Sequence, residues 1–236
     1  MQTIMNRHRA SGALAIATAC ALVLLGAVSV GAQARIDGIE SATDGTMFSF
    51  TARAGDISTP DGGAIHFWGY EEDAGIEGVG LPQYPGPTLI LQQGDAVTIT
   101  FKSELPFGQC SSMVFPGHSV EAIGGSTGDL TQESCSGADI VTYEFTASEP
   151  GTYTYYSGTD SALQVEMGLV GALIVRPSMG EGYAYNSAET AFDHEVLFLL
   201  TSMDPRVHQL AEQDRFDEID LNERKAVYWF INGRAA

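Results

Sequence analysis

Hydrophobic and polar residues alternate along several short segments of this chain, the pattern of β-strands that bury one face. The alternation is clear in residues 96–101, where Val97, Ile99 and Phe101 point to one side, and again in residues 140–147. Turn-forming residues separate these segments, and we expect strands at residues 47–52, 64–70, 96–101, 110–115, 140–147, 152–156, 168–175, 194–203 and 226–231. Short strands at this spacing predict an all-β fold, a Greek-key β-sandwich.

Residues 151–177 contain two of these strands, joined by a long connection. Residues 152–156 are β-branched and aromatic, which suits a pleated and half-buried strand, and residues 168–175 form an apolar run suited to a sandwich core. Residues 157–161 supply turn chemistry between them. By contrast, residues 120–130 contain three glycines and are expected to form a loop.

The length of 236 residues allows one large β-domain, or one domain and part of another. Composition changes after Pro177, and apolar residues at roughly helical spacing predict a short surface helix within residues 206–224. We expect four segments: a signal peptide at 1–34, a first domain at 45–177, a linker with one strand and a short helix at 178–225, and the interrupted start of a second domain at 226–236.

The first 34 residues have the three-part pattern of an export signal. Arg7 and Arg9 lie in a positive head, residues 13–30 form an apolar body, and residues 32–34 read Ala-Gln-Ala, a cleavage pattern. The apolar body is long enough for a membrane anchor, but the cleavage pattern and the absence of a basic stop favour export. We therefore expect a periplasmic or secreted mature protein that begins near Arg35.

The chain is strongly acidic, with 30 Asp and Glu against 11 Lys and Arg and a formal net charge of −19. Such a surface repels phosphate backbones and anionic lipids, so we expect no nucleic-acid partner and no membrane partner after signal cleavage. Solubility is the simplest reason for the acidic excess. The sequence contains neither a nucleophile-elbow motif nor a phosphate-binding P-loop.

Three cysteines are present, and Cys20 lies inside the predicted signal peptide. A lipoprotein site at Cys20 is disfavoured, because apolar sequence continues well beyond it. Cys110 and Cys135 remain as an even pair in an oxidising compartment, so we expect a disulfide rather than a thiolate metal site. Closing the loop between them is worth roughly 3–4 kcal/mol in a chain-entropy estimate.

Four stretches carry a family resemblance: YPGPTLILQQGD at 84–95, SSMVFPG at 111–117, GTYTYY followed by QVEMGLVGALIVRP within 151–177, and FINGR at 230–234. Together they resemble the multicopper oxidase and copper nitrite reductase superfamily, built from plastocyanin-like (cupredoxin) domains. The resemblance implies a cupredoxin-like sandwich and copper as cofactor, with one-electron oxidation of a substrate coupled to reduction of oxygen or nitrite. It also implies a downstream second cupredoxin domain or a partner subunit, and a homotrimeric assembly.

The resemblance also assigns positions to the copper ligands, and none of them carries a good ligand in this chain. The first His-x-His pair of the family matches Val114 and Pro116, and the second pair matches Tyr156 and Gly158. The blue-copper thiolate of the nitrite reductases would fall at Ser157. Because copper prefers imidazole and thiolate, we predict that the chain has no catalytic, cofactor-binding or metal-binding residue.

Isolated histidines, acids and methionines elsewhere do not complete a site. His118, two residues beyond Pro116, is expected to be a surface-loop histidine, and Met167, a potential axial ligand, a core residue. The remaining polar candidates have neither ligand-like spacing nor an acid–base partner: His66, Asp160, Glu166, His194 and His208.

Two functions follow from these observations. The first is an exported multicopper-oxidase-like protein, of which this chain is the N-terminal part and is not catalytic alone. The second is a cupredoxin module for binding or assembly that has lost its copper. A mononuclear electron carrier similar to plastocyanin is disfavoured, because no free cysteine accompanies a pair of histidines.

Overall fold

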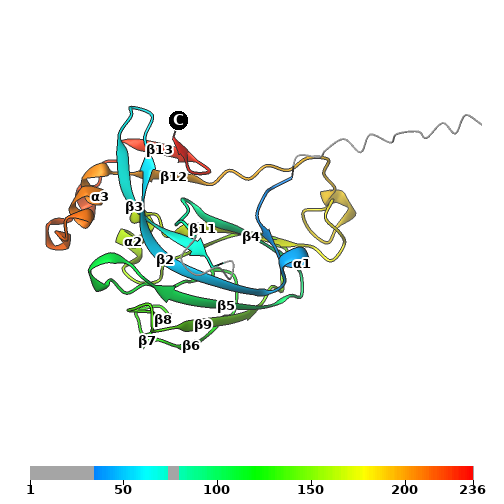
Figure 1. The fold of residues 1–236 in the computed structure, drawn as a ribbon. Helices are drawn as coiled ribbons and strands as arrows, with labels where there is room; N and C mark the ends of the chain where they lie inside the picture. The colour runs from blue at the N-terminus through cyan, green and yellow to red at the C-terminus, as the bar shows by residue number, and fades with distance from the viewer. Residues whose placement is uncertain (1–34, 74–79, 236) are drawn as a thin grey trace, which may run out of the picture. The chain divides into compact units, whose positions relative to one another are not determined.

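The computed structural model of this protein describes residues 35–73 and 80–235, whose main body consists of two β-sheets. The first sheet runs in the spatial order β1 (Ile39–Glu40), β4 (Gly86–Gln92), β11 (Val170–Arg176) and β10 (Gly151–Tyr156). The second runs in the order β3 (Ala64–Glu72), β2 (Met47–Ser58), β5 (Ala96–Ser103), β9 (Val141–Thr146) and β6 (Glu121–Gly124). Both sheets contribute to one apolar core, so the predicted β-sandwich is confirmed (Figure 1).

Alternating side chains of the strands build this core. In β5, Val97, Ile99 and Phe101 are buried, as the alternation of the sequence predicts. Tyr155 of β10 belongs to the same core from the other sheet and is fully buried. Its hydroxyl donates a hydrogen bond of 2.6 Å to the carbonyl of Pro87, so the burial of this phenol leaves no polar atom without a partner.

Two predicted local structures differ from those observed. Residues 110–115 do not form a strand, because their two bridges go to different partners: Ser111 pairs with Ser134, and Val114 pairs with Tyr156. Residues 120–130, predicted to be loop, contain β6 and β7 (Ser126–Thr127). The strand β6 pairs with β9, and β7 pairs with β8 (Gln132–Glu133). Backbone ladders at a sheet edge do not require apolar alternation, so the sequence pattern gave no sign of these strands.

Short helices connect the strands. The helix α2 (Ser161–Met167) lies in the connection after β10, where only turn chemistry was expected. It ends at Gly168, whose φ of 122° favours glycine and whose N–H donates to the carbonyls of Gln164 and Val165. The helix α3 (Pro205–Glu212) lies within the stretch of predicted helical spacing. The other helical segments are α1 (Ser41–Asp44) and the 3₁₀ turns Pro106–Gly108, Ala188–Thr190, Phe216–Glu218 and Leu221–Glu223.

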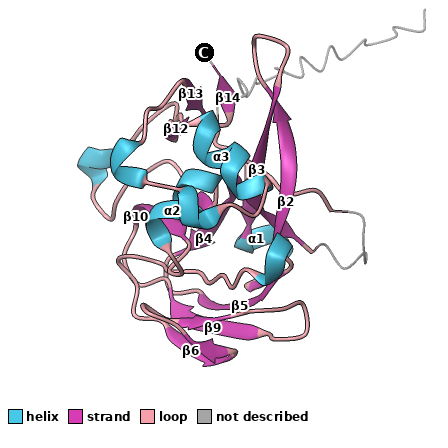
Figure 2. Ribbon diagram, turned by 90° about the vertical axis from the view of Figure 1, so that its left-hand side faces the viewer, coloured by secondary structure: helices cyan, strands magenta, loops and turns pink. Residues whose placement is uncertain are grey.

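The segment after the sandwich lies against it. A third sheet contains β12 (Leu200–Met203), β13 (Tyr228–Ile231) and β14 (Arg234–Ala235), and β12 is shorter than the predicted strand at 194–203. Met203 and Phe230 of this sheet are buried together with Ile65 and Phe67 of β3. Both α2 and α3 contact β3 (Figure 2). The segment is therefore packed on the sandwich, and its assignment as the start of a second domain stays a prediction.

The structure contains the predicted disulfide between Cys110 and Cys135. Within residues 35–73 and 80–235 no helix is both long and apolar enough to cross a membrane. The predicted signal peptide at residues 1–34 lies outside the described residues.

Candidate functional site

Four of the five positions that the resemblance assigns to copper ligands come together in the fold. Val114 and Tyr156 face each other in an antiparallel bridge: the Val114 N–H donates to the Tyr156 carbonyl at 2.8 Å, and the Tyr156 N–H to the Val114 carbonyl at 3.2 Å. Gly158 is close enough that a Cβ there would lie 2.8 Å from Cγ1 of Val114. Ser157 lies between Tyr156 and Gly158 in the sequence and is fully buried. The fifth assigned position, Pro116, is exposed.

A hydrogen-bonded cluster of Ser111, Ser157 and Gln164 occupies the position assigned to the thiolate; we call it the serine–glutamine cluster. The Ser157 hydroxyl donates to Oε1 of Gln164 at 2.6 Å, and the Ser111 hydroxyl donates to the same oxygen at 2.9 Å. Nε2 of Gln164 donates to the carbonyl of Cys110 at 2.7 Å. Because the amide oxygen and nitrogen both have partners, the three buried side chains hold one another in a fixed arrangement.

Hydroxyl and carboxylate groups extend this cluster on the side of Gly158. The Ser112 and Thr159 hydroxyls lie 2.9 Å apart, and Thr159 donates to Oε2 of Glu133 at 2.7 Å. The Gly158 N–H donates to the Ser112 hydroxyl at 3.1 Å. Every donor in the serine–glutamine cluster and this extension is a hydroxyl, an amide or a backbone N–H that already has a hydrogen-bond partner.

The disulfide between Cys110 and Cys135 lies beside the serine–glutamine cluster, because the Cys110 carbonyl accepts from Gln164. Cys110, Glu133 and Cys135 place one potential ligand atom each within 4.8 Å of one another. Both sulfurs are joined in the disulfide, so neither is a thiolate. In the described part of the chain this is the one grouping of three histidine, cysteine or acidic side chains at metal-ligand distances.

His118 and Met167 take no part in a ligand set. Met167 is fully buried in the main core, as predicted. The ring of His118 is partly buried rather than free in a loop, with centroids 5.0 Å from Phe145 and 4.6 Å from Tyr153. Burial lowers the pKa of His118 below its ordinary value, which favours the neutral ring.

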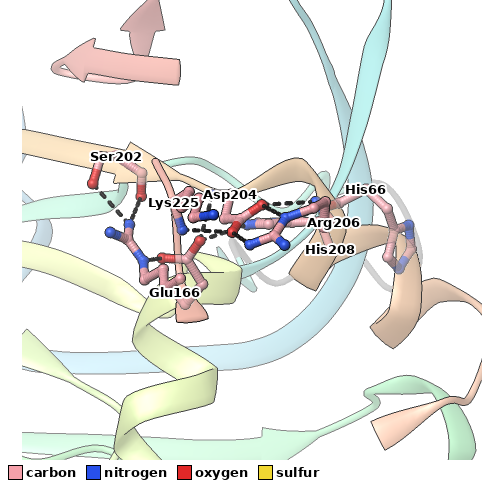
Figure 3. A network of polar contacts seen from close by, with 8 residues as sticks. His66, Glu166, Ser202, Asp204, Arg206, His208 and Lys225 are labelled. Atoms are coloured by element: carbon pink, nitrogen blue, oxygen red, sulfur yellow. Dashed lines mark hydrogen bonds and ion pairs between the residues drawn. The ribbon is translucent and has the colours of Figure 1, made fainter. Parts of the chain in front are cut away.

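A second polar site, which the sequence did not indicate, surrounds Glu166 at the end of α2 (Figure 3). Nε of Arg224 donates to Oε2 of Glu166 at 2.5 Å, and the backbone N–H of Asp204 donates to Oε1 at 2.6 Å. Nε2 of His208 lies 3.7 Å from the same Oε1, too far for a hydrogen bond but close enough for an ion pair when the ring is protonated. Nδ1 of His208 is 2.6 Å from the carbonyl of His66 on β3.

Asp204 continues this site as the N-cap of α3. Its carboxylate accepts the N–H and guanidinium of Arg206 and, at 2.7 Å, the backbone N–H of Lys225. Nη2 of Arg224 donates to the carbonyl of Ser202 at 2.9 Å. We call Glu166, Asp204, His208 and Arg224 the buried ion network; it ties α2 of the sandwich to β12, α3 and the chain before β13.

The surroundings of Asp204 and Glu166 lower the pKa of both carboxyl groups. Burial by itself raises the pKa of Asp204, but the bonds from Arg206 and Lys225 outweigh it and lower the pKa to about 2. Burial likewise raises the pKa of Glu166, while contacts with His208, the Asp204 N–H and Arg224 lower it overall. Both groups are therefore carboxylates at neutral pH, in spite of their burial.

These shifts predict a loss of stability in acid. A carboxyl whose folded-state pKa is lowered contributes stability above its unfolded pKa and loses it as the pH falls through the folded value. For Asp204, whose pKa falls from 3.8 to about 2, we expect roughly 2 kcal/mol to disappear between about pH 5 and about pH 2. The free energy of unfolding, measured with urea across this range, should depend less steeply on pH in Asp204→Asn than in the parent protein. Asp193 is exposed, and Asp193→Asn should keep the pH dependence of the parent. Equal slopes in all three proteins would contradict the assignment.

Comparison with known proteins finds similarity to multicopper oxidases. The sequence model of the multicopper oxidase family matches residues 78–180. A multicopper oxidase of Talaromyces pinophilus is 35% identical over 97 residues, which cover 40% of this chain and 15% of that protein. Copper resistance protein A of Escherichia coli is 30% identical over 123 residues, which cover 52% of this chain and 19% of that protein. The chain thus spans less than a fifth of these two relatives.

Solved structures share the fold. A copper nitrite reductase from Nitrosomonas europaea aligns with a TM-score of 0.54 at 20% identity, covering 79% of this chain and 56% of that one. The multicopper oxidase mgLAC aligns with a TM-score of 0.56 at 21% identity, covering 79% of this chain and 53% of that one. These comparisons support a likeness to the multicopper oxidases that the family model places at residues 78–180, and the solved structures share the cupredoxin-like sandwich of this chain.

Proposed function

We propose that this chain is the exported N-terminal cupredoxin domain of a multicopper-oxidase-like protein, and that it holds no copper itself. The observation that carries this proposal is the serine–glutamine cluster at the position assigned to the thiolate. The domain would then serve as structural scaffold, while the copper-dependent oxidoreduction of the family depends on ligands from a second cupredoxin domain or a partner subunit.

The donors of the cluster do not fit a copper ion. Copper in such sites takes thiolate, imidazole and thioether ligands, whereas Ser111, Ser157 and Gln164 offer neutral oxygen and an amide. Both hydroxyl protons are donated to Oε1 of Gln164, so a metal would have to break these buried bonds to reach the oxygens. A buried polar group left without a partner costs about 1–3 kcal/mol, which adds to the unfavourable ligand chemistry.

Export is supported by two independent features. Residues 1–34 combine a positive head, an apolar body and an Ala-Gln-Ala cleavage pattern. The disulfide between Cys110 and Cys135 is the kind of bond that persists in oxidising compartments. We therefore propose a periplasmic or secreted location, and a homotrimeric assembly by analogy with the family.

Copper analysis tests the proposal. The mature protein, beginning at Arg35, is incubated with copper, desalted and measured for copper per mole and for blue-copper absorption. We expect neither stoichiometric copper nor the absorption band. A matched variant with Ser111→His, Ser157→Cys and Gln164→His places the His₂Cys donors of a blue-copper site on the same three positions and serves as the comparison. Stoichiometric copper on the unmodified chain would refute the proposal.

A further inference from the structure

A cavity lies between the sandwich and the segment that follows it. It has a volume of about 650 Å³ and is lined by residues of β10, β11, α2 and β12, together with Arg224. Small-molecule sites in proteins are concave, occupy about 300–1,000 Å³ and combine apolar walls with a few polar groups. The cavity has this size, and its three walls have this make-up.

Strand register builds the first wall. Tyr155 is buried in the core, so Thr154 and Tyr156, its neighbours in β10, lie on the opposite face of the strand. Val170 of β11 is paired with Tyr156 and shares that face. Thr154, Tyr156 and Val170 all line the cavity. The half-buried ring of Tyr156 thus gives this wall an aromatic surface.

Helical spacing places one side of α2 in the core and another side in the cavity. Leu163 and Met167, four residues apart, are buried in the core. Ala162, Val165 and Glu166, at spacings of three and four residues, line the cavity. Ala162 is exposed and Val165 is half-buried, so the cavity is open to solvent along this second wall.

The third wall comes from the segment after the sandwich. Leu199 and Leu200 contribute apolar surface, and Ser202 and Arg224 contribute polar atoms. Arg224 uses its Nε to bond Glu166 and its Nη2 to bond Ser202. Its Nη1 forms no hydrogen bond with the residues that the structure describes, and the side chain is 31% exposed. One guanidinium N–H group is therefore available to a molecule in the cavity.

The charges at the cavity favour a ligand without net charge. The guanidinium of Arg224 is balanced by the carboxylate of Glu166, so an entering anion would face Glu166 and an entering cation would face Arg224. A flat apolar body fits the aliphatic walls and packs on the ring of Tyr156. A carbonyl oxygen on that body would accept a hydrogen bond from Nη1 of Arg224.

We propose that this cavity binds one uncharged organic molecule, with a flat apolar body and a carbonyl acceptor. The site goes beyond the proposed function, because it uses no copper and does not depend on whether copper is bound elsewhere. Its walls belong both to the sandwich and to the segment that follows. A bound molecule therefore contacts both parts and stabilises their packing.

Titration with Prodan, an uncharged naphthyl ketone whose emission moves to the blue in apolar surroundings, tests the proposal. We expect saturable binding of one Prodan per chain, a blue-shifted emission, and a melting temperature that rises with Prodan concentration. Dimethylaminonaphthalene, the same fluorophore without the ketone, should bind roughly tenfold more weakly, because Nη1 of Arg224 then has no acceptor. Absence of saturable Prodan binding would overturn the proposal, and equal affinity for the two probes would overturn the assigned carbonyl contact.

A matched pair of variants on β10 locates the bound probe. Thr154→Trp should weaken Prodan binding by roughly tenfold or more, because its indole fills part of the cavity. Thr152, on the same face of the strand, lines a neighbouring cavity of about 320 Å³ instead, and Thr152→Trp should bind as the parent does. Ala162→Phe narrows the cavity from α2 and should repeat the loss. Melting temperatures without probe confirm that each variant is folded.

Two results would overturn this location. The first is undiminished binding by both Thr154→Trp and Ala162→Phe. The second is loss of binding in Trp229→Ser, which removes an aromatic ring that is 64% exposed on the third sheet and does not line the cavity. Hydrogen exchange gives an independent readout: saturating Prodan should slow amide exchange in β12 of the parent and leave exchange in Thr154→Trp unchanged.

Discussion

Glu166→Ala is expected to lower the free energy of unfolding by about 3 kcal/mol and to loosen residues 200–225. Glu166 is almost fully buried and accepts from Arg224 and from the backbone N–H of Asp204. Its removal leaves the Asp204 N–H without its acceptor and Arg224 without its counter-ion. The Arg224 side chain is 31% exposed and its guanidinium can turn partly to water, which places the cost at the lower end of those known for broken buried ion pairs.

Chemical unfolding and hydrogen exchange measure this effect. Amide exchange within α3 and β12 should speed up more than exchange in β5 or β9, because the buried ion network joins the C-terminal segment to the sandwich. Glu166→Gln keeps an acceptor for the Asp204 N–H and should recover part of the stability. Glu218 pairs with Arg215 on the surface, with both side chains about half exposed, and Glu218→Ala should have no measurable effect. A Glu166→Ala variant as stable as Glu218→Ala would contradict the role of the network.

Removal of the disulfide is expected to have an effect of similar size. The double variant Cys110→Ala and Cys135→Ala should lose roughly 3–4 kcal/mol, because the bond closes a loop with a sequence separation of 25 residues. The loss should extend to the serine–glutamine cluster, since the Cys110 carbonyl accepts from Gln164.

Urea unfolding with and without a reductant tests this expectation. The reductant should lower the unfolding midpoint of the parent protein to that of the double variant, and should leave the variant itself unchanged. A parent midpoint that does not respond to full reduction, confirmed by counting free thiols, would contradict the stabilising role of the bond.

Much of the sandwich could be predicted from local pattern. The alternation at Val97, Ile99 and Phe101 is a property of the strand itself, and it placed β5 correctly. The disulfide followed from an even cysteine pair. Residues 110–115 were predicted wrongly as a strand because local sequence cannot reveal that the bridges of a segment go to separate partners.

The polar sites were harder to predict, because their members meet only through the fold. Glu166 and Asp204 are 38 residues apart, and Glu166 and Arg224 are 58 apart, so no spacing in the sequence joins them. The one local signal was Asp204 before Pro205, a pattern typical of a helix start. The sequence shows which residues occupy the positions that the resemblance assigns to copper ligands, among them Val114, Tyr156 and Ser157. That Ser111 and Gln164 hydrogen-bond to one another beside Ser157 required the structure.

Copper K-edge anomalous diffraction from crystals grown with copper tests the central claim most directly. The account predicts no anomalous peak within bonding distance of the Ser157 hydroxyl or the Gln164 amide, and the hydrogen bonds of both serines to Oε1 of Gln164 intact. A peak between Ser111, Ser157 and Gln164, with those hydrogen bonds replaced by metal contacts, would contradict it.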